Sequence, residues 1–158
     1  MTSTSELAGT AAPAFSDLLL PTDGTKRMTR VVDLAIDVAS QFGARLHVLY
    51  VVDAERGRFT GSNARQKPFQ WGDVVTGDVA ELARYRGVEP VTVIREGVPH
   101  EVILDYAREA AVDLIVVGID RPRTVVGYAA DLLGHTPMGT TSSHVIYRAQ
   151  VPVLSVRV

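Results

Sequence analysis

Five short apolar runs, separated by segments with helical periodicity, are the feature that most constrains the fold of this chain. The runs show little alternation between apolar and polar residues, which is typical of parallel strands that are covered on both faces. Strands that alternate with amphipathic helices predict an α/β domain, with helices on both faces of a parallel sheet. The five predicted strands are Asp17–Pro21, Leu46–Val52, Val91–Ile94, Leu114–Gly118 and Pro152–Val158.

Four helices are predicted between these strands. The clearest pattern runs from Met28 to Phe42, where apolar residues recur at three- and four-residue spacings and Gly43 supplies the stop signal. Residues 54–68 are polar and are expected to form a surface loop, whereas Arg95–Pro99 is expected to form a turn. The other predicted helices cover about Trp71–Arg86, Pro99–Ala110 and Ser142–Ala149.

Length and composition exclude several classes of protein. The 158 residues fit one domain, and a formal net charge of −2 gives no argument for a nucleic-acid or membrane-surface partner. The absence of cysteine excludes disulfides and thiolate metal sites, and it fits a reducing compartment. Met1–Pro13 lacks the basic and apolar regions of a signal peptide, and no apolar run approaches the roughly 20 residues that insert across a bilayer. We expect a disordered tail at residues 1–13, a domain at residues 14–158 and a cytoplasmic location.

The carboxyl ends of the strands are the expected place for a ligand, because open parallel sheets bind ligands there, where the strand order reverses. The turns after the first and fourth strands are the candidates. The first carries Thr22–Thr25, and the second begins at Gly118 and closes on the small-residue segment Gly139–Ser143 just before a helix. Free N–H groups and the helix dipole favour an anion at such a helix start. We therefore predict a nucleotide-binding site.

Several separated stretches resemble the universal stress protein family and together cover roughly residues 15–158 in the order of that family. The resemblance implies a three-layer α/β/α fold of the Rossmann-like, adenine nucleotide alpha hydrolase-like type, with five parallel strands in the order 3-2-1-4-5. It also implies binding of ATP or another adenine nucleotide, with Mg²⁺ as an ion that the nucleotide would bring. The stretches are Leu18–Thr25, Phe42–Asp53, Glu96–Pro99, Ala111–Gly118, Gly139–Ser142 and Val151–Val156.

The phosphate loop departs from the Gly-x2-Gly-x9-Gly-Ser/Thr signature of ATP-binding members. Gly118 matches the first glycine and Gly139–Thr140 the final pair, but Arg121 occupies the second glycine position. The separation of 139 − 118 = 21 exceeds the 13 of the signature by 8 residues. Both ends of the phosphate loop match the signature and its middle is expanded. Two alternatives therefore stay open: the loop binds phosphate, or it has another function.

The resemblance implies a set of nucleotide-binding residues. The carboxylate of Asp23 would accept hydrogen bonds from nucleoside hydroxyls. A role in the turn or as a helix cap explains an aspartate at this position equally well. The hydroxyls of residues 140–143 would contact phosphate or ribose, and an ordinary helix cap is the alternative. The predicted binding residues are Pro21, Thr22, Asp23, Val51, Val52, Val117, Gly118, Asp120, Arg121, Gly139, Thr140, Thr141 and Ser142.

Catalytic and metal sites are not expected. His47 lies in an apolar strand and is interpreted as structural, whereas His135 and His144 are expected to lie near each other, and His100 follows a helix start. These histidines do not have the spacing of a metal site. The chain has neither a Gly-x-Ser-x-Gly nucleophile motif nor a Walker A loop. We therefore expect a protein that is not an enzyme.

The final strand predicts a dimer. In the order 3-2-1-4-5 it lies at an edge, yet Val151–Val158 is markedly apolar, and exposed apolar edges promote aggregation. Pairing with a second copy would cover it, as the family resemblance also implies; the alternative is that residues 1–13 fold over the edge. Three functions remain: a nucleotide-binding regulatory protein without rapid turnover, a dimeric signalling module that has lost nucleotide binding and contacts an unknown regulatory partner, and a slow ATP hydrolase.

Overall fold

The computed structural model describes residues 14–53, 66–120 and 141–158. The predicted disordered tail and most of the phosphate loop lie outside these residues. The strands are β1 (Asp17–Pro21), β2 (Arg45–Asp53), β3 (Pro90–Gly97), β4 (Leu114–Ile119) and β5 (Val153–Arg157). The helices are the short 3-10 helix η1 (Lys26–Met28), α2 (Thr29–Phe42), α3 (Gln66–Tyr85), α4 (Pro99–Glu109) and α6 (Thr141–Arg148).

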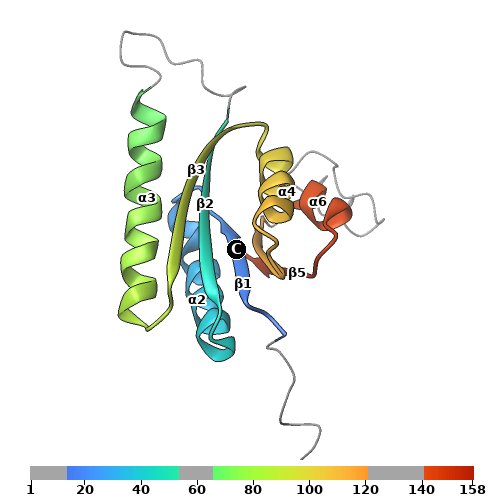
Figure 1. The fold of residues 1–158 in the computed structure, drawn as a ribbon. Coiled ribbons are helices and arrows are strands. Elements are labelled where there is room, and N and C mark those ends of the chain that lie inside the picture. Colours follow the sequence, from blue (N-terminus) through green and yellow to red (C-terminus); the bar gives the residue numbers. More distant parts are fainter. Residues whose placement is uncertain (1–13, 54–65, 121–140) are drawn as a thin grey trace, which may run out of the picture.

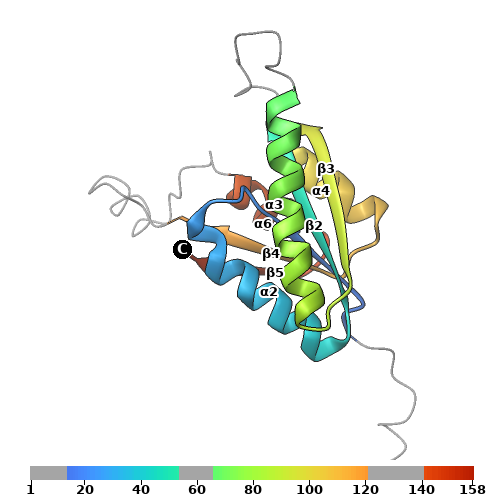
Figure 2. The same cartoon turned by 90° about the vertical axis from the view of Figure 1, so that its left-hand side faces the viewer.

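The described part of the chain forms three layers around one parallel sheet. The strand order is β3-β2-β1-β4-β5, and every neighbouring pair is parallel. Helices α2 and α3 cover one face of the sheet and α4 and α6 the other (Figure 1). Figure 2 looks onto the first of these faces, where α2 and α3 lie side by side in front of the strands. The predicted α/β/α fold and the strand order 3-2-1-4-5 are confirmed.

Strand β1 explains why the apolar runs are uninterrupted. Leu18 and Leu20 pack with α2 on one face, whereas Leu19 packs on the other face with Ile103 of α4 and Val145 of α6. Successive side chains of a strand point to opposite faces. A strand in the centre of a three-layer domain therefore needs apolar residues at every position, and the three leucines are 0% exposed.

Two boundaries differ by three or more residues from those that the sequence predicts. Strand β3 continues through the segment that was expected to turn, because β2 extends to Asp53 and supplies a partner, with Val51 opposite Arg95 and Asp53 opposite Gly97. Helix α3 begins at Gln66, within the expected surface loop. The helix also passes through Gly77, whose missing side chain would meet nothing within 4 Å.

Strand β5 lies at the edge of the sheet, as predicted, with β4 as its neighbour. Val156 is buried, whereas Val153 and Leu154 are only half-buried. Within the residues that the structure describes, no helix has the length and apolar character needed to cross a membrane.

Candidate functional site

The strand order reverses between β1 and β4, which are neighbours in the sheet. After β1 the chain enters η1 and α2 on one face, whereas α6 after β4 packs on the other face. In open parallel sheets, the carboxyl ends of strands at such a reversal point are where a ligand-binding crevice is expected. Of the predicted site residues, Pro21 ends β1, and Val117 and Gly118 lie near the end of β4.

The turn after β1 is held by its own hydrogen bonds. The N–H of the buried Thr22 donates to the Leu49 carbonyl at 3.0 Å, and Thr22 Oγ1 accepts from the Gly24 N–H at 3.2 Å. Asp23 Oδ1 accepts from the N–H and the hydroxyl of Thr25, at 2.9 and 2.8 Å. The turn role of Asp23 is confirmed. Its side chain remains exposed at the carboxyl edge of the sheet.

The end of β4 carries two contacts that run to opposite faces. Ser142 Oγ, in the first turn of α6, donates to the Gly118 carbonyl at 2.6 Å. On the other face, Asp120 Oδ1 accepts from Arg27 Nη1 of η1 at 2.6 Å. Gly118 also lies close to η1 and α2, since an added Cβ would be 3.0 Å from Met28 Sδ and 3.4 Å from Val31 Cγ2. The structure thus brings Ser142 to Gly118, whereas Asp120 pairs with Arg27.

Arg27 is the residue of this site that the sequence reasoning missed. It lies 93 positions from Asp120. One signal could have found it: Lys26 and Arg27 lie just before α2, where the helix dipole disfavours cations, and the first turn of α2 has no acidic residue.

The base side of the predicted site is formed by β2. Val51 and Val52 pair in register with Arg95 and Glu96 of β3, and the Val52 side chain belongs to the core. Partial burial raises the pKa of the Tyr50 hydroxyl, and the Asp23 carboxylate raises it further. The Tyr50 ring also packs under α3, because a Cβ at Gly72 would lie only 2.8 Å from it.

Helix α3 closes the back of the β1 turn. A Cβ on Gly24 would lie 2.3 Å from Val75, so this glycine permits both the positive φ of 74° and the close approach of α3. A hollow of about 240 Å³ remains between α2 and α3 beside the turn. Among its lining residues are Thr22, Gly24, Met28, Trp71, Val74 and Val75.

The remaining predicted residues divide into two groups. Pro21 ends β1, Val117 is a buried core residue of β4, and Thr141 is the first residue of α6. Arg121, Gly139 and Thr140 lie outside the described residues. A larger hollow, of about 670 Å³, lies between α4 and the end of α6. None of the predicted nucleotide-binding residues that the structure describes lines this hollow.

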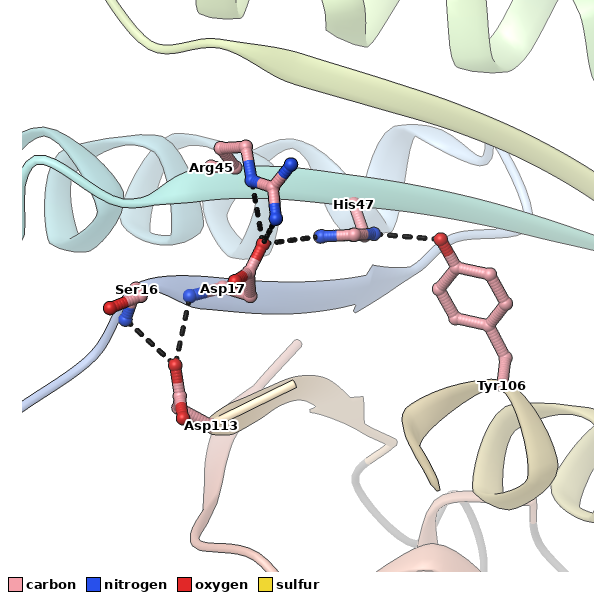
Figure 3. Close-up of polar contacts among 6 residues, drawn as sticks. All are labelled: Ser16, Asp17, Arg45, His47, Tyr106 and Asp113. Atoms are coloured by element: carbon pink, nitrogen blue, oxygen red, sulfur yellow. Dashed lines mark hydrogen bonds and ion pairs between the residues drawn. The ribbon is translucent and has the colours of Figure 1, made fainter. Parts of the chain in front are cut away.

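The buried His47 belongs to a partly buried polar network at the amino-terminal end of the sheet (Figure 3). Asp17 Oδ1 accepts from Arg45 Nε and His47 Nε2, each at 2.8 Å, and the Asp113 carboxylate accepts from the Asp17 N–H at 3.0 Å. His47 Nδ1 lies 2.7 Å from the hydroxyl of the buried Tyr106. The structural interpretation of His47 is confirmed.

The other described histidines join two helices. His144 of α6 stacks on His100 of α4, with ring centroids 4.2 Å apart and an interplanar angle of 17°. The expected neighbour His135 lies outside the described residues. Across residues 14–53, 66–120 and 141–158, no group of three or more His, Cys, Asp or Glu side chains could hold a metal ion.

The parallel sheet, with helices on both faces and a reversal of strand order between β1 and β4, defines a Rossmann-like α/β protein. A model of the universal stress protein family matches residues 14–157, and the chain belongs to this family. A universal stress protein of Methanocaldococcus jannaschii is 29% identical over 150 residues, which cover 90% of this chain and 82% of that protein. One of Bacillus subtilis is 28% identical over 155 residues, covering 90% of this chain and 99% of the relative.

Solved structures of the family share the fold. A universal stress protein in complex with cAMP superposes with a TM-score of 0.67 at 20% identity, covering 90% of this chain and 97% of that chain. The protein from Archaeoglobus fulgidus in complex with dAMP has a TM-score of 0.65 at 19% identity, covering 90% and 98%. Adenine nucleotides therefore bind some proteins of this fold.

Proposed function

We propose that this protein binds an adenine nucleotide in the crevice between the ends of β1 and β4, and that it acts as a regulatory protein without rapid turnover. The observation that carries the proposal is the hydrogen bond from Ser142 Oγ to the Gly118 carbonyl. It holds the first turn of α6, an anion-favouring helix start, at the end of β4, beside the β1 turn. The similarity to proteins solved with cAMP and dAMP supports the same ligand class.

The residues present fit such a ligand. Gly118, Thr141 and Ser142 would face phosphate or ribose. Oδ2 of Asp23 is available to ligand hydroxyls because the bonds within the turn use Oδ1. The backbone of Val51 and Val52 would meet the base. The roles of Arg121, Gly139, Thr140 and the Mg²⁺ ion stay predictions from the sequence, as does the cytoplasmic location.

A binding role is favoured over hydrolysis by the state of the two carboxylates at the crevice. Asp23 is engaged with Thr25, and Asp120 is paired with Arg27. Among the described residues, each of these carboxylates thus serves in a local contact. We propose that the slow-hydrolase alternative has the least support.

We also propose that the protein is a homodimer through Val151–Val158. The half-buried Val153 and Leu154 at the edge of the sheet support this interface, because a second β5 would cover them and would pair the edge of the strand that faces away from β4. A nucleotide-free dimeric module that contacts a regulatory partner is the second candidate, favoured by the expanded phosphate loop.

The test is direct binding. The purified protein is denatured and its supernatant chromatographed for co-purified nucleotide, and ATP, AMP and cAMP are titrated by calorimetry. Ser142→Ala should weaken binding, whereas Ser40→Ala, which removes an exposed hydroxyl of α2, should leave it unchanged. Absence of bound nucleotide together with no affinity at millimolar ligand would contradict the proposal and leave the dimeric module.

A further inference from the structure

One ion pair joins the two loops that flank the crevice. Arg27 follows the β1 turn and Asp120 follows β4, and Arg27 Nη1 lies 2.6 Å from Asp120 Oδ1. The neighbouring residues confirm the close approach of the two loops, since Met28 Sδ packs toward Gly118. The guanidinium of Arg27 is therefore held next to the strand end at which the proposed phosphate site begins.

The charges around Arg27 are unusual for the start of a helix. Lys26 and Arg27 are exposed and precede α2, and the N-cap residue Met28 has no capping side chain. The amino-terminal end of a helix carries partial positive charge, so it disfavours cations and favours anions. Asp120 is the one carboxylate that pairs with these two cations among the described residues. A bound polyanion would interact favourably with the cations and with the helix end.

The ion pair is suited to exchange. The side chains of Arg27 and Asp120 are 46% and 57% exposed, and exposed ion pairs contribute little to stability. A phosphate group can accept two parallel hydrogen bonds from a guanidinium, which makes it a stronger partner than a carboxylate contacted by one nitrogen. Arg27 can therefore leave Asp120 for a phosphate at small energetic cost.

We propose that Arg27 is a phosphate-binding residue of the nucleotide site, and that Asp120 is its partner in the absence of nucleotide. This inference rests on the proposed function and assigns it a selectivity. A di- or triphosphate chain reaches Arg27 and replaces Asp120 as its partner, which strengthens binding of the nucleotide. Adenosine has no phosphate and does not gain this contact. Asp120, predicted from the sequence as a binding residue, thus competes with phosphate for Arg27.

Calorimetric titration with ATP and with adenosine tests this assignment in the full-length protein. Arg27→Gln should weaken ATP binding on the order of tenfold, because a hydrogen bond to a charged group is lost, and should leave adenosine binding unchanged. Asp120→Asn should strengthen ATP binding by up to about fivefold, because the competing ion pair is removed. Opposite effects of two mutations in one ion pair are not expected from a merely structural contact.

Arg30→Gln is the matched control. It removes the same charge from an exposed arginine three positions further along the chain, in the first turn of α2. Its effect on ATP binding should be small and should disappear at high salt, which screens charges that do not touch the ligand. The effect of Arg27→Gln should persist at high salt. Thermal melting of each variant establishes that it is folded.

Two results would overturn the inference while leaving the proposed function intact. In the first, the protein binds adenosine, but the wild type and Arg27→Gln bind ATP with the same affinity. The second is a loss of ATP affinity in Asp120→Asn as large as that in Arg27→Gln, which would make the ion pair structural. Failure of the wild type to bind either ligand would instead refute the proposed function, and this inference with it.

Discussion

Removing a single hydroxyl from the polar network in Figure 3 should destabilise the protein measurably. The ionised carboxylate of Asp17 can only accept hydrogen bonds, so Nε2 of His47 carries the proton that it donates to Asp17. In the neutral imidazole, Nδ1 is then an acceptor, and its donor is the hydroxyl of Tyr106 at 2.7 Å. Tyr106→Phe leaves this nitrogen without that donor.

The magnitude follows from burial. His47 is 5% and Tyr106 7% exposed, so water cannot readily replace the lost donor. An unsatisfied buried polar group costs about 2 kcal/mol, which corresponds to a decrease in Tm of about 4–8 °C for a domain of this size. The ring itself is retained, including its contact with the Arg95 guanidinium 4.9 Å from the ring centroid.

Urea unfolding followed by circular dichroism measures the effect, with Tyr85→Phe as the matched control. Tyr85 is 88% exposed, so the same chemical change there should alter the free energy of unfolding by less than about 0.5 kcal/mol. A free energy of unfolding for Tyr106→Phe that equals that of Tyr85→Phe would refute the claim that this hydrogen bond stabilises the fold.

Three further predictions concern the turn, a surface carboxylate and the edge strand. Gly24→Ala should lower the Tm more than Gly43→Ala, because both glycines have positive φ but only a Cβ at Gly24 would clash with α3; equal shifts would contradict this. A hydrogen bond from Arg95 holds the pKa of Glu109 in the folded protein below its usual range. The contact therefore stabilises the fold at pH values above the usual pKa of a glutamate. This stabilisation is lost as the pH falls through the lowered pKa of the folded protein. An NMR titration of the Glu109 carboxyl should show the low midpoint, and Arg95→Gln should raise it. Ser155→Pro should convert the proposed dimer to a monomer in analytical ultracentrifugation. Backbone N–H groups point alternately to the two sides of a strand, and the N–H of Ser155 points away from β4, toward the proposed partner strand. Proline removes this N–H group, so a persisting dimer would place the interface elsewhere.

The fold was predictable because its main signals are local. The consecutive leucines of β1 indicate a strand that is covered on both faces, and the helical spacing of apolar residues from Met28 to Phe42 predicts α2. The extension of β3 to Gly97 was not predictable from its own residues. It depends on the partner that β2 provides in register, and pairing partners are set by the sheet and not by the segment.

The candidate site divides in the same way. The turn role of Asp23 could be proposed from the sequence because its bonds reach only two residues along the chain. The pairing of Arg27 with Asp120 and the stacking of His100 on His144 join distant segments, and no local pattern specifies them. The one local signal for Arg27 was its charge at the wrong end of a helix.

The sequence by itself determined the alternation of strands and helices, the location of the glycine-containing turn after β1, and the family resemblance. These follow from side-chain periodicity and from the conformational freedom of glycine, which act over a few residues. Only the tertiary structure decided which side chains meet across the crevice. Gly118 lies 24 positions from Ser142, and Arg27 lies 93 positions from Asp120. Contacts of that sequence separation arise only when the packed sheet brings its carboxyl ends to one edge.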